Sequence, residues 1–117
     1  MLLLAAILGG ALAIFLTEQS RTPELLRGLD RENSKADREF SQRITRTFPA
    51  GSSEDELIEA LSTQGFALKR QRSTPEQEAV FNFSNLACVA NARVWWRTDA
   101  SGRLTAIRSR YGEEGCW

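Results

Sequence analysis

The chain has 117 residues, enough for one small domain, and its 15 basic and 15 acidic side chains cancel to a net charge of zero. It contains no histidine, which excludes His-ligated zinc, facial-triad iron and Ser-His-Asp or Cys-His catalysis. Balanced charge gives no reason to expect a nucleic-acid partner. An enzyme would have to work with carboxylates or a Ser/Lys pair, so we expect a binding protein without a catalytic site, a metal or a cofactor.

Residues 2–16 form an apolar run of fifteen residues without a charge. As a helix this run would be about 22 Å long, between a signal-peptide core and the roughly 30 Å of a bilayer. It can be an uncleaved membrane anchor, a signal peptide cut after Ala13, or a buried core helix. We favour a transmembrane anchor or signal segment over 1–17, and the uncleaved form of it, because cleavage would leave apolar Ile14 to Leu16 at the new terminus.

The two signals for membrane sidedness disagree. The twenty residues after the apolar run hold four basic residues and none precedes the run, which places the rest of the chain in the cytoplasm by the positive-inside rule. Cys88 and Cys116 are the only cysteines and lack metal-binding spacing, so they predict a disulfide, and disulfides persist outside the cytosol. We expect the domain to face the periplasm or another extracytoplasmic space. The alternative is a cytosol-facing, membrane-anchored regulator.

Residues 18–34 are polar and charged and are expected to be a membrane-proximal stalk. Within this stalk, Pro23 is suited to the first position of a short helix. Three leucines would give that helix a narrow apolar face: Leu25, Leu26 and Leu29.

Two helices are predicted next. The first covers 35–47, begins with a capping box from Ser34 to Asp37 and ends at Pro49. The second covers 54–64. The buried stripe of the first helix is expected to hold Ala36, Phe40, Ile44 and Phe48. The buried face of the second helix is expected to hold Leu57, Ile58 and Leu61.

The second helix has clear end signals. Ser53 and Glu56 form a capping box, and Gly65 is placed to end the helix. The acids at the start suit the positive end of the helix dipole. We interpret them as a solvated helix start rather than a metal or acid–base cluster, because neighbouring residues on a helix point apart. These acids are Glu54, Asp55, Glu56 and Glu59.

After Gly65 the pattern changes to alternation, which predicts strands over 66–71, 79–84, 92–98 and 103–111. A loop covers 72–78, a connection with Cys88 covers 85–91, a hairpin loop covers 99–102, and a tail follows from 112. Two helices and an antiparallel meander make residues 35–117 a small α+β two-layer domain. The inward residues are expected to be Phe66, Leu68, Phe81, Phe83, Val94, Trp96, Leu104, and Ala106 or, after a bulge, Ile107.

The neutral total hides a local charge asymmetry. Residues 48–64 carry four acids and no base, whereas 65–112 carry eight bases and three acids. Alternation places Arg93, Trp95 and Arg97 on the outer face of the sheet, with Arg103 on the neighbouring strand. These four residues are our candidate surface for a protein or an anionic envelope polymer. The alternative is an exposed sheet face on which arginine stems cover a tryptophan through cation–π contact.

The order of parts resembles a known family. An N-terminal membrane-targeting segment precedes two helices, the second introduced by Gly51-Ser-Ser-Glu-Asp-Glu-Leu57, and a sheet with Val94-Trp-Trp96 and Asp99-Ala-Ser-Gly102 follows. This arrangement, over roughly 35–112, is similar to the small bacterial envelope domains of the SmpA/OmlA type, outer-membrane-assembly lipoproteins with a fold like β-lactamase inhibitor protein. The resemblance implies a non-enzymatic accessory domain that binds protein and lipid partners. The chain departs from the family in having no lipobox cysteine, and Gln64-Gly65-Phe66 stands where the family has Leu-Gly-x-Pro.

Overall fold

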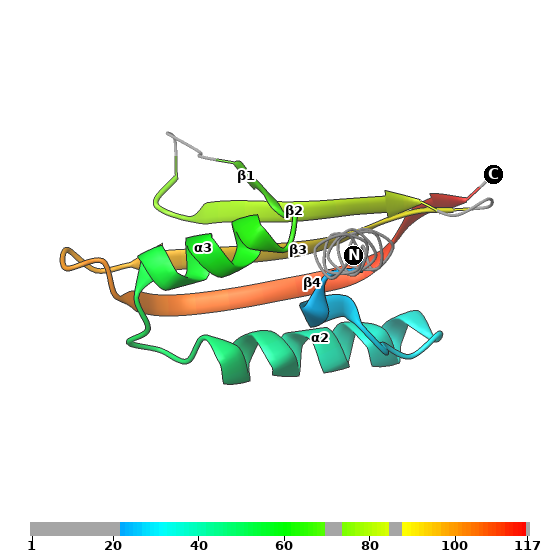
Figure 1. Cartoon of the computed structure of the whole chain (residues 1–117), viewed down its shortest axis with the longest axis horizontal. Coiled ribbons are helices and arrows are strands. Elements are labelled where there is room, and N and C mark those ends of the chain that lie inside the picture. The colour runs from blue at the N-terminus through cyan, green and yellow to red at the C-terminus, as the bar shows by residue number, and fades with distance from the viewer. Residues whose placement is uncertain (1–21, 70–73, 85–87, 117) are drawn as a thin grey trace, which may run out of the picture.

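The computed structural model describes residues 22–69, 74–84 and 88–116, and it has an α+β fold (Figure 1). Four antiparallel strands form one sheet in the order β1-β2-β3-β4, as the predicted meander requires. The predicted anchor over 1–17 lies outside the described residues, and none of the helices within them is both long and apolar enough to cross a membrane. The elements are the 3-10 helix η1 (Glu24–Leu26), helices α2 (Asn33–Thr47) and α3 (Glu54–Thr63), and strands β1 (Ala67–Lys69), β2 (Gln77–Ser84), β3 (Cys88–Thr98) and β4 (Leu104–Cys116).

Helix α2 packs along β4 with the predicted apolar stripe (Figure 1). Ala36, Phe40 and Ile44 are buried, and Phe48 closes the helix with its N–H bonded to the Ile44 carbonyl. The predicted capping box is wrong, because Glu32 is the N-cap residue and no side chain caps the helix. The Asp37 carboxylate instead accepts a hydrogen bond of 2.8 Å from the backbone N–H of Tyr111 on β4.

Helix α3 begins at the predicted position, but its start is held by the sheet. Ser53 is the N-cap residue without a side-chain bond, so the second capping box is also absent. Ser53 forms an antiparallel bridge with Arg103, and the flanking backbone exchanges bonds of 2.8 Å with Leu104. The connection between the two helices therefore lies against the edge of β4.

The end of α3 confirms the predicted role of Gly65. Its φ of 92° is a left-handed conformation that an L side chain rarely adopts. The next residue, Phe66, donates its N–H back to the Leu61 carbonyl, which satisfies one of the open groups at the helix end. Phe66 is thereby turned into the core.

Three strands extend beyond their predicted bounds at one end, whereas β1 begins at Ala67, one residue later than predicted. β3 begins at Cys88, inside the predicted connection, and β4 continues to Cys116 through the predicted tail. Cys88 and Cys116 face each other in the ladder and are joined by a disulfide, with their Cα atoms 4.0 Å apart. β2 likewise begins at Gln77, inside the predicted loop, because it pairs with β3 as far as Trp96.

The core fills the space between the helices and the inner face of the sheet. Trp96 is only 2% exposed, whereas Leu68 is 36% exposed because it lies on the short edge strand β1, so the inward prediction for Leu68 is wrong. A register shift after Arg97 turns Ile107 rather than Ala106 toward the core. Fully buried partners include Val94 and Leu104, and Phe81 and Phe83 pack against them half-buried.

The segment expected to be a polar stalk belongs to the core from η1 onward. Leu25 and Leu26 are buried in the same cluster as Phe40, and Leu29 packs against it. The Leu25 N–H donates to Gln64 Oε1 at 2.9 Å, which ties η1 to the end of α3. The three leucines that were expected to form the apolar face of a stalk helix thus belong to the core of the domain.

Candidate functional site

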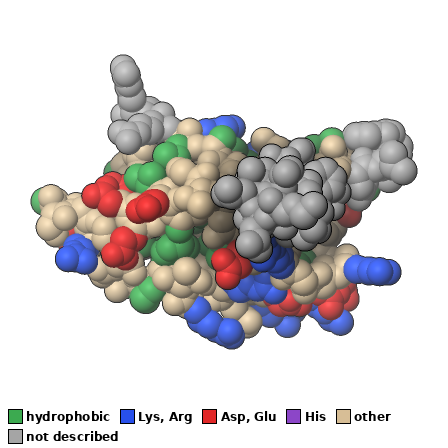
Figure 2. Space-filling view, viewed as in Figure 1, with side chains coloured by type: hydrophobic (Ala, Val, Ile, Leu, Met, Phe, Trp, Pro, Cys, Tyr) green, Lys and Arg blue, Asp and Glu red, His purple; other side chains and the backbone are tan. Residues whose placement is uncertain are grey.

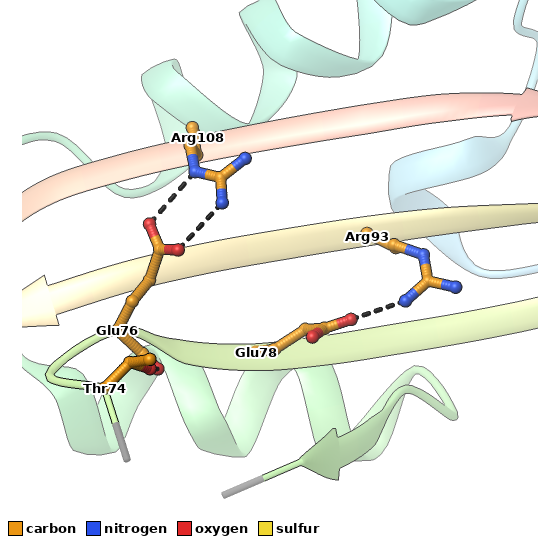
Figure 3. A network of polar contacts seen from close by, with 5 residues as sticks. All are labelled: Thr74, Glu76, Glu78, Arg93 and Arg108. Carbon is orange, nitrogen blue, oxygen red and sulfur yellow. Dashed lines mark hydrogen bonds and ion pairs between the residues drawn. The ribbon is translucent and has the colours of Figure 1, made fainter. Parts of the chain in front are cut away.

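The structure places Arg93, Trp95 and Arg97 together on the outer face, the side of the sheet away from α2 and α3. β3 alternates here, because Val94 and Trp96 are buried while their three neighbours are not. In the ladder, Trp95 lies between Glu78 of β2 and Arg108 of β4. Figure 3 views this face with the helices behind the sheet.

Arg103 is not part of the cluster around Trp95. It precedes β4 and pairs with Ser53, and its Nη1 lies 3.4 Å from the Gly51 carbonyl. Its guanidinium is therefore directed toward the connection between α2 and α3. Arg103 was predicted to lie near Trp95 from a regular pairing across the hairpin, but the ladder has a register shift after Arg97.

The arginine that covers Trp95 is Arg108, which the sequence analysis did not single out. Its guanidinium carbon lies 4.0 Å from the ring centroid. Glu76 accepts two hydrogen bonds from the same guanidinium, at 2.7 and 3.0 Å (Figure 3). These bonds hold the pKa of the Glu76 carboxyl below its ordinary value of 4.5, because they favour the ionised form. The alternation of residues along β4 could have predicted that Arg108 lies beside Trp95. This prediction requires the position of the bulge, because the bulge sets which residue of β4 pairs with Trp95.

A second ion pair lies beside the first. Arg93 Nη1 and Glu78 Oε1 are 2.6 Å apart, and the Glu78 side chain is buried although it lies on the outer face (Figure 3). A buried carboxylate requires a partner, and Arg93 supplies a charge-assisted bond. Both glutamates were assigned to a loop from the sequence, so neither pair was predicted.

Two arginines on the outer face are exposed and are not held by a carboxylate of the described residues. Arg97 and Arg110 are exposed, and neither forms an ion pair within the part of the chain that the structure describes. The outer face therefore carries excess positive charge after its two carboxylates are neutralised. Its cations are Lys69, Arg93, Arg97, Arg108 and Arg110, and its acids are Glu76 and Glu78.

The other end of the sheet brings Cys88, Glu113 and Cys116 together, with potential ligand atoms within 4.8 Å of one another. Both sulfurs belong to the disulfide. Metal coordination by cysteine requires a thiolate. In this oxidised form the group is a covalent link between β3 and β4, and it offers a metal only the carboxylate.

Comparison with known proteins adds no relative: no family model matches the chain, and no significant match is found among curated proteins or solved structures. The resemblance to SmpA/OmlA domains therefore stays a prediction. The function is inferred below from the chemistry of the described residues.

Proposed function

We propose that the protein is a non-enzymatic accessory domain of the cell envelope, anchored in the membrane by residues 2–16, that binds an anionic partner protein or envelope polymer through the outer face. The domain faces the extracytoplasmic side in this proposal. The disulfide between Cys88 and Cys116 supports that side, because such bonds persist in oxidising compartments.

The open cations on the outer face are the observation that carries the binding proposal. Arg108 and Arg93 are held by carboxylates, so they order the face without offering their full charge to a partner. Arg97 and Arg110 flank these pairs and stay exposed. Arginine beside a partly covered tryptophan is a common composition of the energetically important centre of protein interfaces.

Site-specific crosslinking in cells tests this surface. A photoreactive residue at position 97 or 110 is expected to trap a partner, whereas the same residue at exposed Glu59 on α3 is not. The charge reversals Arg97→Glu and Arg110→Glu should each abolish the crosslink from the other of the two positions, because they repel an anionic partner. Neither replacement removes a residue of the two ion pairs, although Arg97 also attracts the Glu76 carboxylate, so circular dichroism is measured to confirm that the fold is unchanged.

The crosslinking result can contradict the proposal in two ways. Equal crosslinking from position 59 would show that contact is not specific to the outer face. Unchanged crosslinking after charge reversal would show that Arg97 and Arg110 do not recognise the partner by charge.

A further inference from the structure

A cavity of about 460 Å³ lies on the other side of the molecule, where η1 meets the second half of α2 and the end of α3. Figure 2 shows Lys and Arg side chains gathered in the region between η1 and α2. The cavity is separate from the outer face, and it is lined by Glu24, Leu25, Arg27, Arg43, Arg46, Thr47 and Gln64.

Arg43 is held in place by the backbone of the η1 segment. Its Nη1 donates to the Leu25 carbonyl at 3.1 Å and to the Arg27 carbonyl at 2.6 Å. A guanidinium has five N–H donors, so the Nε and Nη2 hydrogens stay available. The side chain is thus positioned at the cavity wall before any ligand binds.

The cavity carries more positive than negative charge along its lining. Arg27, Arg43 and Arg46 line it together, and Glu24 is the one acid among the lining residues. None of these four takes part in an ion pair among the described residues. The three guanidinium groups together attract an anion toward the cavity.

Gln64 and Arg27 provide further hydrogen-bond donors at the cavity wall. Gln64 uses its Oε1 to accept the Leu25 N–H, which leaves its amide hydrogens free to donate. Arg27 uses only Nε, which donates to the Thr22 carbonyl at 3.2 Å, so both of its terminal nitrogens stay available.

We propose that this cavity binds a phosphate group, held by Arg27, Arg43 and Arg46 with help from Gln64. Phosphate presents several acceptor oxygens in a tetrahedron and can receive hydrogen bonds from three guanidinium groups, whereas a carboxylate has only two oxygens. The group belongs to a phospholipid headgroup or to free phosphate. Thr22 follows the apolar run by six positions, so a headgroup is within reach if residues 2–16 are the anchor proposed above.

Calorimetric titration of the full chain in an uncharged detergent tests the site. Sodium phosphate is titrated against sodium chloride of equal ionic strength, and phosphatidylglycerol in mixed micelles against diacylglycerol, which lacks the phosphate. Arg27→Gln and Arg46→Gln should each weaken phosphate binding about tenfold, since each removes a charge-assisted hydrogen bond. Arg38→Gln is the matched control, because Arg38 is also exposed on α2 but does not line the cavity.

The two phosphate probes distinguish the possible sources of the phosphate group. Binding of both probes shows that a phosphate group suffices, and binding of phosphatidylglycerol alone assigns the site to a lipid headgroup. Binding of neither phosphate probe above its control would overturn the proposal, as would an equal loss in Arg38→Gln. The outer-face variants at Arg97 and Arg110 should bind phosphate normally, which keeps this test independent of the partner proposed for the outer face. Unchanged thermal unfolding of the two cavity variants excludes misfolding as the cause.

Discussion

At the scale of single residues, carboxylates decide which arginines of the outer face are open to a partner. Glu76 and Glu78 each engage one arginine, and the Glu76 pair also fixes Arg108 over Trp95. The cation–π contact that was the alternative interpretation of this face is present, but Arg108 forms it rather than one of the candidate arginines. The tryptophan is therefore both a stabilising contact and the half-covered centre of the proposed binding surface.

The pair between Glu76 and Arg108 predicts a pH-dependent contribution to stability. Because the pKa of Glu76 is lowered in the folded state, the unfolded chain takes up the proton first as the pH falls. The stabilisation is thus fully present above about pH 4.5 and is lost as the pH falls through the folded-state pKa. Glu76→Gln should lower the free energy of unfolding above pH 4.5, and the effect should fade at lower pH until little remains below the folded-state pKa of Glu76.

Urea unfolding of the two proteins over a pH series measures this difference. The effect should be small, because Arg108 is more than half exposed and water screens the pair. Asp99, whose pKa is also lowered, is present in both proteins and cancels in the comparison. A difference that stays constant down to acid pH would assign the effect of the variant to something other than the charge of Glu76.

At the scale of elements, α3 is attached to the sheet at its first turn. Trp96 Nε1 donates a hydrogen bond of 2.8 Å to Glu54 Oε2, and the Glu54 N–H donates to the Gly102 carbonyl of the β3–β4 hairpin. Glu54 was expected to serve the helix dipole alone. Its second role joins residues 42 positions apart and sets the position of α3 on the sheet.

Replacement of Trp96 by phenylalanine should measure this attachment. Trp96→Phe keeps an aromatic core residue but removes the N–H donor, and the loss of a bond to a charged group should lower the free energy of unfolding by about 1.5 kcal/mol or more. Trp96 is buried, so the smaller ring also leaves a cavity, and a double-mutant cycle with Glu54→Ala separates the two effects. Urea unfolding followed by circular dichroism measures the four proteins, and additive losses would mean that the bond to Glu54 adds nothing.

At the scale of the whole molecule, the domain depends on one core on one face of a small sheet. The leucines of η1 are part of that core, and the disulfide joins the two longest strands, β3 and β4, at one end of the sheet. Domains of this size bury a limited share of their surface, so a covalent link makes a large relative contribution. The bridge joins residues 28 positions apart.

The double variant Cys88→Ser/Cys116→Ser should be less stable by roughly 3.6 kcal/mol, the chain-entropy value for a loop of this length. Comparison of its urea unfolding with that of the oxidised chain measures the difference. The same loss is expected when the native protein is reduced, and equal stability of reduced and oxidised protein would contradict the prediction.

Mass spectrometry of the native protein after rapid alkylation in cells tests the compartment. An intact disulfide, with no alkyl group added before reduction, is expected for a domain in the envelope. Two alkylated cysteines would favour the cytosol-facing regulator instead. The same mass shows whether residues 1–13 are retained, which distinguishes the anchor from a cleaved signal.

Elements whose signals are local could be predicted from the amino-acid sequence alone. The apolar stripe of α2, the end of α3 at Gly65 and the hairpin at 99–102 all depend on residues within one or two turns of chain. In the hairpin, Asp99 accepts the N–H groups of Ser101 and Arg103. The cysteine pairing was equally accessible, because only two cysteines exist.

The partner of each polar side chain, in contrast, depends on how distant segments pack and could not be predicted. Asp37 was predicted as a helix cap and bonds to β4, Arg43 holds the backbone of η1, and Glu76 bonds to Arg108 across two strands. The ends of β3 and β4 were also missed, because their glycines and alanines have weak strand preference and are held by pairing. These features share one cause: packing brings distant segments together, and a polar group then bonds to whatever donor or acceptor the fold places beside it.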